Sequence, residues 1–280
     1  MGFTIAACEA LDNAGLSEAD IVEGLKTALV VGTDSSVTTT SATDGYLKDQ
    51  AIKILLPPEA KVITDNLQYV EQLSVLKAVG VDLSGMVDKT ITSMNRAAES
   101  AAKQAAPIFK SSITNLNITD GLSILNGKNP ASKKKSGAEF DSTAATQYLI
   151  STTRDTLTGL YAKPVDAELD KDLLGLGFST NTAWTNLTSG YNLVADAAQK
   201  AISADALLPD FLKVYSPSQI SMLQKFAPIQ QTSLGTYVTG KALDGLFLKV
   251  GNEEREIRRD PLQWAKDAVG TILEKVFGKK

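Results

Sequence analysis

The chain has 280 residues, of which 43% are hydrophobic, with one cysteine and no histidine. This length and apolar content are enough to bury one large core or two closely packed ones. A formal net charge of −4 and a pI near 5.1 exclude an overall cationic field that would hold nucleic acid, and one cysteine excludes an internal disulfide.

Residues 1–15 contain the sequence Ile5-Ala6-Ala7-Cys8, which is typical of a bacterial lipobox. Small residues directly before the cysteine are what a cleavage site requires. We therefore predict that Cys8 is lipidated and that residues 1–15 act as a tether. A signal peptide is longer than the seven residues before Cys8, so this interpretation needs sequence upstream of Met1. The alternative is a cytosolic protein whose lone thiol packs as a small hydrophobe.

The first long element is a predicted helix over residues 17–31. Ser17 followed by Asp20 is a helix start signal, and apolar residues recur after it at helical spacing. A polar, turn-rich stretch over residues 38–45 predicts a loop. The apolar run 51–56 ends at two prolines and fits either a buried extended segment or a brief helix, and we favour the extended segment.

From Asp82 onward the apolar residues advance alternately by four and three positions, which predicts a helix that buries one continuous stripe. Asn95, Arg96 and Glu99 lie at or beside the border of this stripe, where they can meet another helix. The stripe consists of Val87, Ile91, Met94, Ala98, Ala101 and Ala105.

The second half of the chain alternates predicted helices with two irregular segments. Residues 126–142 form an inserted loop, and a helix is expected over residues 143–161. A cap cluster at Ser179 begins a helix in which Trp184 is interpreted as a core anchor. Residues 205–231 contain three prolines and predict short helices joined by kinked turns. The stripe after Trp184 continues through Leu187, Tyr191, Val194 and Ala198.

Opposite charges three and four residues apart predict a salt-bridged helix end near the C-terminus. Asp260 before a first-turn proline then predicts the start of a last helix, with an apolar face over residues 262–276. The charged pairs are Glu254 with Arg258 and Glu256 with Arg259.

The periodicity is helical nearly everywhere, and no Val/Ile-rich alternation is long enough for a sheet. The sequence therefore predicts an all-α fold, a multi-helix bundle of roughly ten helices with little or no sheet. We expect a single helical domain over residues 16–280, which carries the inserted loop 126–142 and the proline-punctuated segment 205–231. No apolar run approaches the ~18 residues of a spanning helix.

One group of charged residues permits a catalytic interpretation. Glu99 or Asp244 would act as acid or base beside Arg96, with Asn95 and Lys241 as ligand-binding candidates. Lys241 and Asp244 are also three residues apart on one helix edge. The competing interpretation is a structural ion-pair network between packed helices, which perturbs charged groups as readily as an active site does. We favour the structural interpretation.

Other chemistries are excluded by missing residues. A serine hydrolase lacks both a Gly-x-Ser-x-Gly elbow and a histidine base. The alternating acids over residues 166–172 lack the glycine and the final Glu of a calcium loop, so no metal site and no cofactor are expected. The run Lys133-Lys134-Lys135 is interpreted as solvated loop charge, with contact to anionic lipid as the alternative.

Several segments over residues 20–277 carry a family resemblance. These segments include Ile52-Lys53-Ile54, Met94-Asn95-Arg96-Ala97-Ala98-Glu99, Ile124-Leu125 with Gly127, Ala145-Thr146, Tyr237-Val238-Thr239, Lys241 through Phe247, Glu253-Glu254, Ile257-Arg258 and Asp260-Pro261. On these segments the chain resembles a bacterial family catalogued as domain of unknown function 4197. The resemblance implies an exported envelope protein and carries over no catalytic residue. The segments 128–142 and 205–231 are longer than the family pattern.

These observations predict a lipid-anchored protein of the cell envelope, on the periplasmic side or the surface, with a non-enzymatic binding or structural role. The alternatives are a carboxylate-based enzyme and a carrier that holds an apolar ligand between its helices. The expected partners are the membrane, through Cys8, and a protein or an apolar ligand.

Overall fold

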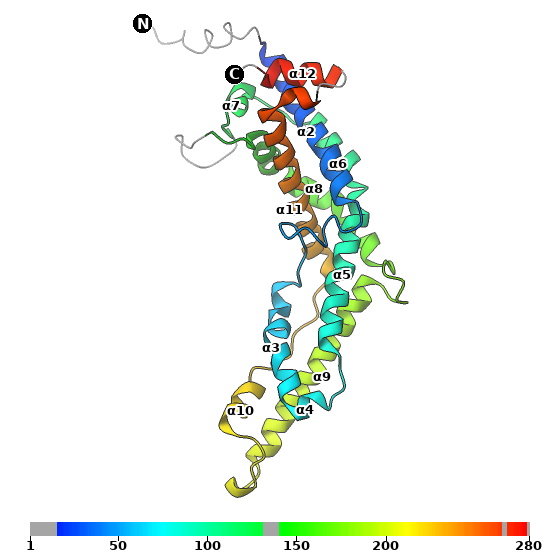
Figure 1. Ribbon diagram of the computed structural model, residues 1–280, viewed down its shortest axis with the longest axis vertical. Coiled ribbons are helices and arrows are strands. Elements are labelled where there is room, and N and C mark those ends of the chain that lie inside the picture. The colour runs from blue at the N-terminus through cyan, green and yellow to red at the C-terminus, as the bar shows by residue number, and fades with distance from the viewer. Residues whose placement is uncertain (1–15, 131–139, 265–267, 279–280) are drawn as a thin grey trace, which may run out of the picture. The chain divides into compact units, whose positions relative to one another are not determined.

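The computed structural model describes residues 16–130, 140–264 and 268–278 (Figure 1). Over these ranges the chain forms eleven α-helices and three short 3-10 helices, with no strand, which confirms the predicted all-α fold. The lipidation candidate Cys8 and the lysines of the run 133–135 lie outside the described residues. In chain order the elements are α2 (Glu18–Thr40), η1 (Pro58–Ala60), α3 (Lys61–Gln72), α4 (Ser74–Lys77), α5 (Leu83–Ala102), α6 (Ala105–Thr114), α7 (Gly121–Leu125), α8 (Ala144–Leu169), α9 (Thr180–Ala206), η2 (Asp210–Leu212), α10 (Pro217–Leu223), α11 (Leu234–Arg259), η3 (Pro261–Trp264) and α12 (Ala268–Phe277).

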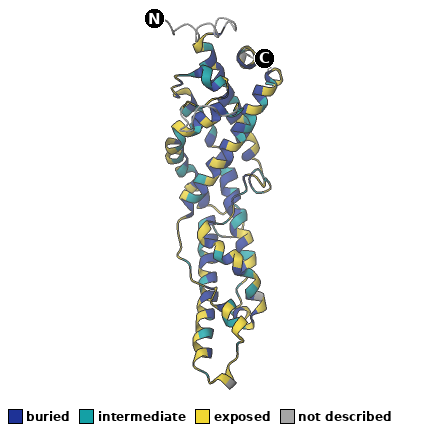
Figure 2. Ribbon diagram, turned by 90° about the vertical axis from the view of Figure 1, so that its left-hand side faces the viewer, coloured by how far each residue is buried: buried dark blue, intermediate teal, exposed yellow. Residues whose placement is uncertain are grey.

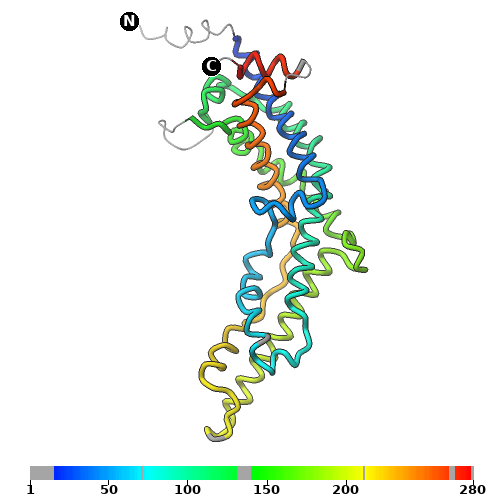
Figure 3. The backbone as a smooth tube through the Cα atoms, viewed as in Figure 1, coloured from blue at the N-terminus to red at the C-terminus, as the bar shows by residue number. Residues whose placement is uncertain are grey.

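The helices group into two compact units. Unit 1 contains the residues up to 45, residues 99–164 and the residues from 240 onward, and unit 2 contains residues 46–98 and 165–239. Figure 3 shows how unit 1 brings together the blue, green and red parts of the chain. Each unit therefore depends on segments far apart in the sequence. The prediction that residues 16–280 form a single domain stays a prediction.

In unit 1, helix α2 packs against α6, α7 and α12. The predicted start signal is confirmed, because the Ser17 hydroxyl accepts the Asp20 N–H and the Asp20 carboxylate accepts the Ser17 N–H. The predicted end at residue 31 is wrong. The buried hydroxyls of Thr33, Ser36 and Thr40 each donate to the carbonyl four residues earlier, at 2.6–2.7 Å, so these polar side chains are satisfied inside a continuing helix.

Gly24 allows α2 and α12 to approach closely. A Cβ built on Gly24 would lie 2.5 Å from Cγ2 and 2.8 Å from Cβ of Val276, which is closer than such atoms can sit. Val276 is itself buried in unit 1, so it has little room to move away. Packing against Val276 thus requires glycine at position 24, although glycine is a poor helix former.

We expect Gly24→Ala to destabilise the protein by about 1 kcal/mol, because overpacking outweighs the gain in helix propensity. Gly159→Ala in α8 is the matched control, since an added Cβ there meets no described atom within 4 Å. This variant should gain up to about 1 kcal/mol. Urea unfolding measures both, and equal stabilisation by the two variants would contradict the packing argument.

Unit 2 is organised around α9, which contacts α4 and α10. Ser179 caps this helix as predicted by accepting the Thr182 N–H. The Trp184 ring is buried, and its Nε1 donates to the Thr232 carbonyl at 2.7 Å, which confirms it as a core anchor. The predicted stripe is also buried along its whole length, at Leu187, Tyr191, Val194 and Ala198.

Two further helix boundaries differ from the predictions. Helix α8 does not end at residue 161 but continues through Pro164 to Leu169, and the buried Val165 and Leu169 hold its last turns in place. Proline costs a helix one hydrogen bond, and apolar burial offsets that loss here. Where the last helix was predicted to start, Pro261–Trp264 forms the 3-10 helix η3, and Leu262 is exposed instead of facing the core. From Ala268 onward α12 is helical as predicted.

Candidate functional site

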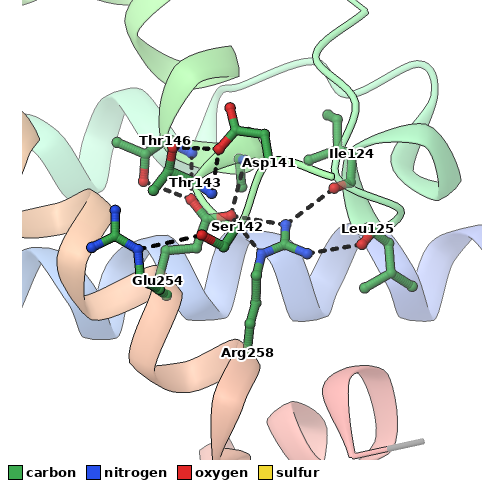
Figure 4. A network of polar contacts seen from close by, with 10 residues as sticks. Ile124, Leu125, Asp141, Ser142, Thr143, Thr146, Glu254 and Arg258 are labelled. Carbon is green, nitrogen blue, oxygen red and sulfur yellow. Dashed lines mark hydrogen bonds and ion pairs between the residues drawn. The ribbon is translucent and has the colours of Figure 1, made fainter. Parts of the chain in front are cut away.

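The most elaborate polar site lies in unit 1 and is built on the last turns of α11 (Figure 4). Glu254 and Arg258 project from the same face, four residues apart. The Nε of Arg258 donates to Oε1 of Glu254 at 2.8 Å, and both side chains are buried. The sequence predicted this ion pair, and the structure confirms it. Its burial was not predicted, because spacing along one helix does not reveal what covers it.

The Glu254 carboxylate caps the beginning of α8. Its Oε1 accepts the N–H of Ala145 at 3.0 Å, and its Oε2 accepts the N–H and the hydroxyl of Thr146, both at 2.7 Å. The first N–H groups of a helix lack partners within the helix and carry a partial positive charge. A carboxylate from α11 therefore supplies the cap that α8 needs.

The Arg258 guanidinium caps the opposite kind of helix end. It donates to the carbonyls of Leu125 at 2.8 Å and of Ile124 at 3.1 Å, at the C-terminus of α7. The rings of Phe140 and Phe277 lie 5.7 and 5.3 Å from the guanidinium carbon, within the range of cation–π attraction. The ion pair thus joins the end of α7 and the start of α8 to α11.

Each charged group of this network is used within the fold. Glu254 accepts four hydrogen bonds and Arg258 donates three, so little capacity remains for a ligand. The arrangement can hold three helices in register, and it offers no exposed acid, base or nucleophile. We conclude that this site is structural.

Asn95 plays a comparable part in unit 2. Its Oδ1 accepts the N–H of Ile54 at 2.8 Å and its Nδ2 donates to the carbonyl of the same residue at 2.8 Å. Both residues are buried. The amide thereby pairs with the segment from Lys53 to Pro57, which lies outside any helix, so the alternative of a brief helix is excluded there. This ligand-binding candidate is occupied by the backbone of its own chain.

Tyr237 holds the same segment from α11. Its hydroxyl lies 3.0 Å from the carbonyl oxygen of Leu55 and 3.2 Å from that of Leu56, and donates to both. Burial, with a smaller contribution from the negative charge of Glu59, raises the pKa of the Tyr237 phenol above its ordinary value. The hydroxyl therefore stays protonated and remains a donor well above neutral pH.

The proposed catalytic residues differ in exposure. Arg96 is half-buried and Glu99 is buried, one turn apart on α5, whereas Asp244 on α11 is exposed. Asp244 accepts a charge-assisted hydrogen bond from Nη2 of Arg154 on α8, at 2.6 Å. Lys241 is exposed on the same helix as Asp244. Their catalytic and ligand-binding roles stay predictions, and no three metal-ligating side chains gather anywhere in the described ranges.

An apolar groove opens on unit 1 along α2, with a volume of about 670 Å³. Its lining on α2 combines alanine and β-branched side chains with the charged residues Glu18, Glu23 and Lys26, and residues of α6 and α12 complete it. The spacing of apolar residues predicted a helix here but no groove on its outer face. The apolar part of the lining is Ala19, Val22, Val30, Val31, Ile113 and Val269.

The sequence of the chain was compared with known proteins and with protein families. No curated protein and no solved structure matches the chain. Among the described helices, none is long and apolar enough to cross a membrane. The family model described as "Protein of unknown function (DUF4197)" matches residues 15–278. Ile124, Thr146, Glu254 and Arg258, which build the buried network, are among the residues on which the resemblance rested. The chain belongs to the DUF4197 family.

Proposed function

We propose that this protein is a lipid-tethered component of the cell envelope with a non-enzymatic role, and that its groove along α2 binds the hydrocarbon chain of an amphiphile. The observation that carries the proposal is the contrast between the two kinds of site. The buried polar network is saturated by its own helices, whereas the apolar groove is open. Apolar concave surfaces are the usual sites for such ligands.

The length and lining of the groove suit a hydrocarbon chain. Its lining on α2 runs from Glu18 to Val31, a length of about 20 Å of helix. A hydrocarbon chain lying along this length would contact apolar side chains of α2, α6 and α12.

The charged residues of the lining do not favour an anionic head group. Glu18 accepts the N–H of Gly121 at 2.6 Å, and Lys26 donates to the carbonyl of Thr114 at 2.8 Å. With Glu23 they supply two acids and one lysine. The recognition we propose therefore rests on the apolar chain, and the head group would stay in solvent.

Binding of cis-parinaric acid, whose fluorescence rises in an apolar site, tests the groove. We expect Val30→Asp to weaken binding by roughly tenfold or more, because the new carboxylate must be desolvated against the chain. Leu160→Asp, at an exposed leucine of the same unit, is the matched control and should bind like the parent. Absence of binding to the parent, or equal binding by the two variants, would contradict the proposal.

The tether is tested separately by the intact mass of the protein recovered after expression from its full gene. The proposal expects Cys8 as an acylated first residue. Recovery of an unmodified Cys8 that still carries upstream residues would exclude the anchor and leave the groove proposal untouched.

A further inference from the structure

A short apolar loop follows the C-terminal end of α9 in unit 2. Between α9 and α10, three aliphatic side chains face solvent: Leu207 is 87% exposed, Val214 is 70% exposed and Leu212 is 53% exposed. Single exposed leucines are ordinary on protein surfaces, but three within eight residues form a patch. Figure 2 shows this part of the chain as largely exposed.

The loop is fixed by a buried carboxylate. Asp205, in the last turn of α9, accepts the N–H of Val214 at 2.7 Å and that of Tyr215 at 3.2 Å. Ser216 then begins α10 with a capping box that includes Gln219. Both ends of the loop are thus held in place. The aliphatic side chains are presented by a formed structure, so their exposure is a property of the fold.

We propose that this loop, residues 207–214, docks on a lipid bilayer, with its aliphatic side chains at the boundary between head groups and acyl chains. Burial of one aliphatic side chain contributes ~1.5–3 kcal/mol, at ~25 cal/mol per Å² of apolar surface. Three such side chains would therefore bury roughly 200–350 Å² of apolar surface. A stable protein interface buries about 800 Å² on each partner. Binding to a bilayer has no such minimum and scales with the apolar area inserted.

The exposure of the side chains points to the same partner. A leucine that is 87% exposed has almost no contact with its own protein, so any partner that buries it has to surround it on nearly every side. A fluid bilayer surrounds a protruding group without a preformed pocket. The side chain of Asp210 is 99% exposed and pairs with Lys213 at 3.3 Å, which limits insertion to the head-group boundary, a depth of about 5–10 Å.

The proposal is independent of the lipidation of Cys8 and is tested without it. In the full chain with Cys8→Ser, flotation with vesicles of phosphatidylethanolamine and phosphatidylglycerol measures membrane binding by the loop alone. Leu207→Asn with Val214→Asn should reduce the bound fraction by roughly tenfold or more. Leu193→Asn with Leu176→Asn, at two exposed leucines of the same unit, is the matched control and should bind like the parent.

Because Cys8 is the only cysteine, the same background accepts one labelled position. The fluorescence emission of an environment-sensitive dye attached to the cysteine of Leu207→Cys should shift to shorter wavelength when vesicles are added. The emission of the same dye on Leu193→Cys should not shift. Failure of the parent to float, an equal loss in both double variants, or equal dye shifts would overturn the proposal. Self-association that requires Leu207 without vesicle binding would also overturn it and would identify a second copy as the partner.

Discussion

Replacing Glu254 with alanine is expected to lower the free energy of unfolding by about 3–5 kcal/mol, because the substitution leaves the buried Arg258 without its counter-charge. The first N–H groups of α8, at Ala145 and Thr146, would lose their acceptor in the same step. Urea unfolding followed by circular dichroism measures the change. Glu254→Gln should cost less, since its amide oxygen still accepts hydrogen bonds at the start of α8.

Glu256→Ala is the matched control for this prediction. Glu256 forms an ion pair with Arg259 on the same helix, but the side chains of that pair are 43% and 69% exposed. Exposed pairs contribute about 0–1 kcal/mol, so this variant should unfold nearly like the parent. A loss at Glu254 no larger than that at Glu256 would show that the buried network does not hold the three helices together.

Replacing Asn95 with alanine should cost about 2–4 kcal/mol. The change leaves the N–H and the carbonyl of Ile54 buried without partners, and each such group costs about 1–3 kcal/mol. Asn95→Leu restores most of the volume without the hydrogen bonds, so it should be destabilised to a similar degree. Thermal and urea unfolding both report the loss.

Asn115→Ala provides the comparison for Asn95. Asn115 is exposed, and its Nδ2 donates to the Ser111 carbonyl within one helix turn. Its removal should change stability by no more than about 0.5 kcal/mol. If Asn95→Leu were as stable as the parent, packing and not pairing with the 53–57 segment would account for the burial of Asn95.

The sequence predicted most helices because their signals are local. The capping residues at Ser17 and Ser179 and the stripe through Trp184 act within a few turns, and all three predictions are confirmed. Two helix ends were predicted wrongly, where α2 continues to Thr40 and α8 passes through Pro164. At both ends burial by distant segments overrides the local preference of hydroxyl residues and proline.

For the candidate sites, the spacing of charged residues along the sequence predicted which of them pair, but not which residues surround each pair. The four-residue spacing of Glu254 and Arg258 predicted an ion pair, which the structure confirms. Nothing in the local sequence indicates that these two side chains cap α8 and α7, because the capped residues lie more than a hundred positions earlier in the chain. The partner of Asp244, Arg154, is also ninety positions away.

The sequence by itself determined the all-α class, the family, the positions of most helices and the pairing of charges within a helix. Periodicity, capping and composition carry that information, since each depends on residues close together in the chain. Only the tertiary structure decided which charges are buried, which backbone groups Asn95 and Glu254 satisfy, and where apolar surface stays open, at the α2 groove and at Leu207. These features depend on which distant segments cover each residue, and that is a property of the packed helices.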